Sequence, residues 1–169
     1  IIEACLLPEA DRLLTTYPQM EMKLASTHAS LAFGETDLIL SFSKPEEGRI
    51  FRFRIGQLRC GFYHAARFNN NLQGWINVDS ETGPHLKLED GIAPLNQSPR
   101  LTVSNLLNAH QLIRTMPLLA YLPCSFADSK PDLMLFEPAG KNQNEIWASY
   151  HYNRKKDPVL KLARDWVES

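Results

Sequence analysis

The chain has 169 residues, of which 44% are hydrophobic and 22% are charged, and its formal net charge is −1. The composition is typical of a globular protein, and the length fits one ordinary domain or two small lobes that share a core. The balanced charge gives no electrostatic basis for nucleic-acid binding by this chain alone, and neither a bilayer-spanning apolar run nor a signal peptide is recognisable.

A helix is predicted over residues 6–17, because apolar side chains recur there at helical spacing. Pro18 disfavours helical geometry at Tyr17, so the helix should end at that residue. Residues 20–24 then alternate methionine and leucine with charged side chains, which predicts a strand.

A second, short helix is expected over residues 28–33, capped by Ser26 or Thr27 and closed by Gly34. The apolar run 38–40 follows and predicts a strand of the kind that parallel sheets bury on both faces. The order helix, strand, helix, strand indicates an α/β unit with a parallel sheet.

Residues 50–65 predict a long extended segment, interrupted at Gly56, that could bridge two lobes. A further strand is expected over residues 75–78, and residues 79–99 are the least regular part of the chain. The arginines of this region are expected to line a solvated strand face rather than a phosphate site: Arg49, Arg52, Arg54 and Arg59.

The remaining sequence predicts a strand that ends in Ser104 and Asn105, either of which can cap a helix from residue 106 to Met116. Asp157 should cap a last helix that has Pro158 at its first position. Between these two helices the sequence predicts three strands, over residues 118–123, 132–138 and 144–152.

Catalytic and metal-binding motifs are absent from the sequence. There is no nucleophile elbow, phosphate-binding loop, dinucleotide fingerprint or Cys-x-x-Cys pair, and the five histidines lack metal-ligand spacing, so neither a cofactor nor a metal is expected. Cys124 is a nucleophile only in principle, because nothing near it in sequence would lower its pKa. Cys5, Cys60 and Cys124 are expected to be buried thiols of a cytoplasmic protein.

Small polar residues recur where predicted strands end. In open α/β sheets, ligands bind outside the carboxyl ends of strands, and helix N-termini there offer backbone N–H groups to anions. Helix capping alone explains any one of these clusters of small polar residues. Three such clusters, contributed by both halves of the chain, favour a binding cleft. The residues predicted to line the cleft are Ser26, Thr27, Ser41, Phe42, Phe62, Tyr63, Ser104 and Asn105.

The hydroxyl and amide groups in this set suit a small anion or a polar metabolite held by hydrogen bonds. Phe42, together with Phe62 or Tyr63, would cover an apolar part of the ligand. The alternative is that the serines only cap helices and the rings only pack.

Several stretches, in this order and spacing, resemble the effector-binding domain of LysR-type transcriptional regulators. The resemblance covers nearly the whole chain and lies in LLPEADRLLTTYPQMEMKL, GETDLILSFSKPEEG, RIGQLRCGFYHAARF, RLTVSNLLNAHQLIRTMPLLAYLP and EIWASYHYNRKKDPVLKLARDWV.

The resemblance implies an α/β fold of the periplasmic-binding-protein-like type 2, with two lobes joined by two crossover strands. Residues 1–62 and 149–169 would form the first lobe and residues 63–148 the second. A small-molecule effector would bind in the cleft between the lobes, and an upstream winged helix-turn-helix outside this chain would bind DNA. The resemblance also implies a homodimer that uses residues 28–33 and 105–116, with no membrane partner.

This chain departs from the family pattern in three places. The family's first strand and the loop after it should precede Ile1. The segment from Phe68 to Trp75 is shorter than is usual in the family, and Pro117-Leu118 stands where the family commonly has a glycine. A narrowed pocket or an unusual effector would follow from these changes. A free-standing solute-binding protein of the same fold is the alternative function, and an enzyme that uses Cys124 ranks last.

Overall fold

The computed structural model of the chain describes residues 7–24, 36–42, 44, 48–79, 94–96, 98–137 and 141–167. The chain divides into two compact units. Unit 1 comprises Ile1–Gln57, Thr82–Pro84 and Glu145–Ser169, and unit 2 comprises Leu58–Glu81 and His85–Asn144. Among the described helices, none combines the length and apolar character that crossing a membrane requires.

The described part of unit 1 consists of two α-helices, the strand β1 and parts of two further strands. Its elements are α1 (Leu7–Thr16), β1 (Ile39–Ser41), the first part of β2 (Ile50–Ala65), the last part of β7 (Lys141–His151), the 3₁₀ turn Tyr152–Arg154 and α4 (Pro158–Val167). In this unit β7 lies between β1 and β2. β1 pairs with β7 in antiparallel register, with Ile39 opposite Ser149 and Ser41 opposite Trp147. The predicted strand is confirmed, but its described pairing is antiparallel rather than parallel.

Aromatic rings from the neighbouring strands β2 and β7 pack against one another in unit 1. The ring of Phe51 stacks on Tyr150 with 5.2 Å between centroids, and Phe53 meets Tyr150 edge-on at 6.3 Å. Tyr150 is almost completely buried, as is Leu160 of α4. The alternation of phenylalanine and arginine along β2 therefore separates a packed face from an exposed one, as the sequence predicted.

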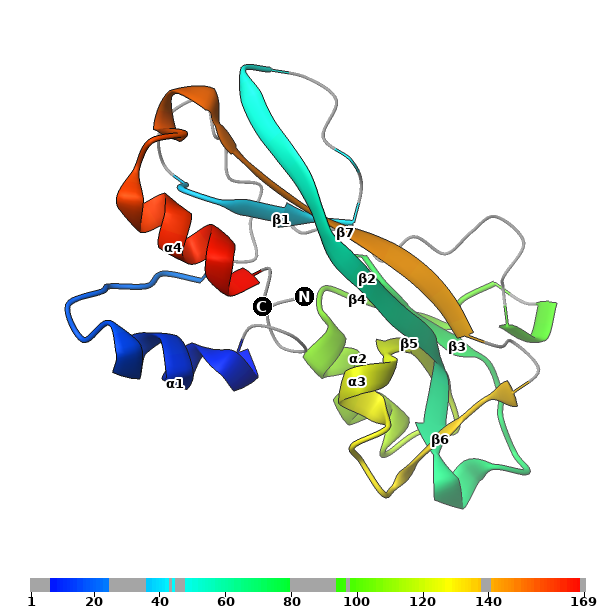
Figure 1. Cartoon of the computed structure of the whole chain (residues 1–169). Coiled ribbons are helices and arrows are strands. Elements are labelled where there is room, and N and C mark those ends of the chain that lie inside the picture. The colour runs from blue at the N-terminus through cyan, green and yellow to red at the C-terminus, as the bar shows by residue number, and fades with distance from the viewer. Residues whose placement is uncertain are drawn as a thin grey trace. The chain divides into compact units, whose positions relative to one another are not determined.

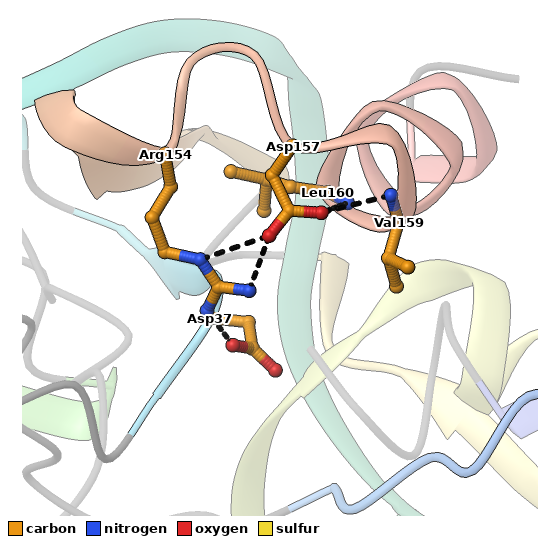
Figure 2. Close-up of polar contacts among 5 residues, drawn as sticks. All are labelled: Asp37, Arg154, Asp157, Val159 and Leu160. Carbon is orange, nitrogen blue, oxygen red and sulfur yellow. Dashed lines mark hydrogen bonds and ion pairs between the residues drawn. The ribbon is translucent and has the colours of Figure 1, made fainter.

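A charged joint connects the start of α4 to the segment before β1 (Figure 2). Arg154 donates to Asp37 and, through Nε and Nη2, to Asp157 Oδ2 at 3.2 and 2.6 Å. Asp157 Oδ1 accepts from the backbone N–H groups of Val159 at 2.9 Å and Leu160 at 3.3 Å. The predicted capping of this helix by Asp157 is thus confirmed.

Unit 2 contains a sheet with helices packed against it (Figure 1). Its strand order is β2-β5-β3-β4, and β6 also pairs with β2. β3 runs parallel to β4 and β5, whereas β2 is antiparallel to β5 and β6. The elements added here are η3 (Ala66–Phe68), β3 (Trp75–Val78), η4 (Pro94–Asn96), β4 (Leu101–Val103), α2 (Leu106–Ile113), β5 (Leu119–Pro123), α3 (Cys124–Ala127) and β6 (Leu133–Leu135).

The core of unit 2 forms where α2 and α3 cover one face of this sheet. Ala109 and Ile113 of α2 and Ala127 of α3 are completely buried against Ala120 and Leu122 of β5. Small residues on the helices let them approach the sheet closely, and β5 is buried along its whole length. A strand of this kind is typical of a parallel sheet enclosed on both faces.

Three local predictions differ from the structure. Residues 20–24 are not a strand, because alternation alone does not supply a partner with which to pair. β2 passes through Gly56 without a break, since its backbone there stays extended. α2 ends at Ile113, and a turn over residues 114–116 fills the space before Pro117. The helix predicted over residues 28–33 lies outside the described residues.

Candidate functional site

The eight predicted cleft residues are divided between the two units. Ser26 and Thr27 lie outside the described residues. Ser41 ends β1 in unit 1, and Phe42 follows it; both are half-buried. A polar and an aromatic side chain therefore lie at the end of this strand, where the sequence predicts a contact with a ligand. Whether they bind a ligand stays a prediction.

Phe62 is part of an aromatic cluster in unit 2. Its side chain is completely buried, with its ring centroid 5.1 Å from that of Tyr121 and 6.0 Å from that of Trp75. These rings occupy the face of the sheet opposite to Ala120 and Leu122, since successive side chains on a strand point to opposite faces. Packing alone therefore accounts for the position of Phe62.

Tyr63 points to the other face and makes a specific polar contact. Its side chain is 1% exposed, and Oη donates a hydrogen bond of 2.5 Å to Asp128 Oδ1. Asp128 Oδ2 lies 3.5 Å from Lys141 Nζ. Because Asp128 is 65 positions away from Tyr63, only the fold reveals this acceptor.

Burial and hydrogen bonding set the protonation of this cluster. Burial, followed by the hydrogen bond to Asp128, raises the pKa of Tyr63 far above its ordinary value, so the phenol stays neutral and donates. The same hydrogen bond, with the charge of Lys141, lowers the pKa of Asp128 and keeps it an acceptor. Tyr63 is consequently fixed as a structural donor inside unit 2.

Ser104 and Asn105 have different roles, although either could have been the helix cap. Asn105 Oδ1 accepts from the backbone N–H of Asn108 at 2.8 Å, so Asn105 caps α2. Ser104 is exposed, and its side chain makes no hydrogen bond within the described residues. Its hydroxyl is therefore available to a ligand without any loss to the helix.

The described residues hold little catalytic chemistry. Cys124 is 7% exposed and begins the four-residue α3, and Cys60 is completely buried, as predicted for both thiols. No group of three histidine, cysteine or acidic residues with metal-binding geometry occurs in the described part of the chain. His110 packs edge-on against Phe126 with 5.0 Å between centroids, and burial lowers its pKa.

No family model matches the sequence, and no curated protein matches it either. Solved structures do match. The effector domain of AmpR from Pseudomonas aeruginosa superimposes with a TM-score of 0.74 at 13% identity, covering 99% of this chain and 89% of that one. The regulatory domain of CrgA from Neisseria meningitidis gives a TM-score of 0.73 at 13% identity over 99% and 92% of the two chains.

A third similar structure is the regulatory domain of MexT, a transcriptional activator of Pseudomonas aeruginosa. It gives a TM-score of 0.72 at 14% identity and covers 99% of this chain and 94% of that one. The chain spans 64% of a second structure of CrgA, a LysR-type transcriptional regulator. The fold of this chain is that of LysR-type regulatory domains, the two-lobed periplasmic-binding-protein-like type 2 fold, which confirms the fold prediction.

Proposed function

We propose that this chain is the effector-sensing regulatory domain of a LysR-type transcriptional regulator and that units 1 and 2 are its two lobes. The observation that carries the proposal is the match to several such domains over nearly their full length. These structures belong to transcriptional regulators rather than enzymes, in agreement with the absence of catalytic motifs from the sequence. DNA binding would belong to a winged helix-turn-helix domain outside this chain, in a cytoplasmic protein.

The proposed effector is a small polar or anionic metabolite that binds between the lobes. Ser41 and Phe42 from unit 1 and Ser104 from unit 2 are the described residues that would contact it. Ser104 supports this role because the structure gives its hydroxyl no other partner among the described residues. A ligand that contacts both lobes can favour one arrangement of the lobes over another, and this would couple ligand binding to regulation.

The first test of this proposal is a thermal-shift screen of small carboxylates, amino acids and aromatic acids for compounds that bind the chain. A compound that binds only the folded chain raises the unfolding midpoint by mass action. If no compound of these classes shifts the midpoint, the sensing function proposed here is wrong.

Ser104→Ala then tests the site with whichever compound binds. We expect effector affinity to fall by about three- to tenfold, the loss of one hydrogen bond of roughly 1 kcal/mol, with the unfolding midpoint unchanged. Asn105→Ala is the matched control, because loss of the cap should cost about 1 kcal/mol of stability. Unchanged affinity in Ser104→Ala would remove Ser104 from the proposed site.

Self-association is the second part of the proposed function. α2 presents Leu107, which is 47% exposed, and Met116, just beyond the helix, is 40% exposed. We expect a two-fold homodimer that uses the surface of residues 105–116. Leu107→Asp should shift the dimer toward monomer in sedimentation equilibrium, whereas Val159→Asp, at another exposed apolar residue, should not. An unchanged dimer in Leu107→Asp would place the interface elsewhere.

A further inference from the structure

A pocket of about 370 Å³ lies in unit 1 where the turn after β7 enters α4. Its volume is within the range of small-molecule sites. One wall is apolar and comes from the buried Tyr150 and Leu160 together with the exposed ring of Pro158. The residues that line it are Tyr150, Lys155, Lys156, Asp157, Pro158, Leu160, Lys161 and Arg164.

The rest of the lining is strongly cationic. Three lysines and Arg164 surround the pocket, with Asp157 as the one acidic residue among the described lining residues. Lys155 Nζ lies 5.7 Å from the ring centroid of Phe51, and Arg164 donates to its neighbour Asp165 at 3.1 Å. The side chains of Lys156 and Lys161 make no hydrogen bond or ion pair within the described residues, and both are exposed.

Asp157 does not neutralise this charge, because its carboxylate is already engaged. One oxygen accepts from the Arg154 guanidinium and the other from two N–H groups of α4 (Figure 2). The hydrogen bond from Arg154, followed by those from α4, lowers the pKa of Asp157. The first N–H groups of α4 are likewise occupied, so the attraction of this pocket for anions comes from its side chains.

We propose that this pocket binds a small phosphate monoester. Several ammonium groups around one hollow suit a dianion with three acceptor oxygens, and the apolar wall accommodates the organic part of the ester. The inference is independent of the effector site proposed above, since none of the lining residues is among those proposed to contact the effector. In the sequence these residues match no binding motif, and their one signal is the run RKKDP, which concentrates positive charge next to a helix start.

Titration calorimetry with phenyl phosphate, at physiological salt, tests the proposal. We expect saturable binding by the full chain that weakens by about tenfold in Lys156→Gln/Lys161→Gln, because two unpaired cations are removed. Lys156→Arg/Lys161→Arg should retain binding. The matched control is Lys23→Gln/Lys130→Gln, which removes the same charge from lysines that do not line the pocket and should bind as the unchanged chain does.

Four outcomes would overturn the proposal. The first is no saturable binding of phenyl phosphate at millimolar concentration. The second is equal weakening in the control variant, since that would indicate net charge rather than a site. The third is equally tight binding of inorganic phosphate, which would assign the pocket to free phosphate. The fourth is tighter binding of a short DNA duplex that depends on Lys156 and Lys161, which would assign the charge to a nucleic-acid backbone.

Discussion

Different kinds of interaction stabilise unit 1 and unit 2, each considered by itself. Unit 2 encloses an apolar core that contains Tyr63 on one face of its sheet, and the completely buried ring of Phe62 packs on the opposite face. In unit 1, the described contacts include a charged joint at Arg154 as well as the ring stack around Tyr150. Loss of a buried ring should therefore destabilise unit 2 more than loss of one charged contact destabilises unit 1.

The strongest test of this comparison removes the central ring of unit 2. Phe62→Ala should lower the free energy of unfolding by about 3–5 kcal/mol, because it deletes a fully buried ring and leaves a cavity. Urea unfolding, followed by circular dichroism, measures the loss. Phe42→Ala, at a half-buried position in unit 1, should cost clearly less. Equal losses would show that the two units do not differ in how burial stabilises them.

The joint of unit 1 is tested by Arg154→Ala. The change removes the partner of both Asp37 and Asp157, so we expect the unfolding midpoint to fall by about 2–4 °C, as a loss near 1 kcal/mol does in a chain of this size. Arg54→Ala is the matched control, because its ion pair with Glu145 is about half exposed and should contribute little. An equal response of the two variants would mean that the joint is only a surface ion pair.

A smaller effect is expected from the pH dependence of unit 2. Burial, with the nearby charge of Arg114, lowers the pKa of His110 from its ordinary 6.5. The unfolded chain therefore binds a proton that the folded chain does not, so stability should fall as the pH drops below 6.5. Replacing His110 with leucine should flatten this slope between pH 7 and 5.5 in urea titrations. A slope that is unchanged would assign the acid sensitivity to other groups.

Much of the local structure could be predicted because its causes are close in sequence. Proline ends α1 within one residue of the predicted position, and Asp157 with Pro158 begins α4 as predicted. The long alternation of residues 50–65 predicted β2 for the same reason. The candidate site was harder to predict from the sequence. Asn105 rather than Ser104 caps α2, because the cap is decided by the φ and ψ angles at the helix start.

The sequence by itself determined the class of the fold, since the order and spacing of its strands and helices already resembled LysR-type effector domains. Only the tertiary structure decided which segments meet. β1 pairs with β7, more than a hundred residues later, and Tyr63 finds its acceptor in Asp128. Residues 20–24 have the alternation of a strand without becoming one. Periodicity arises from each residue and its near neighbours, whereas pairing and burial depend on partners that are brought together by the folded chain as a whole.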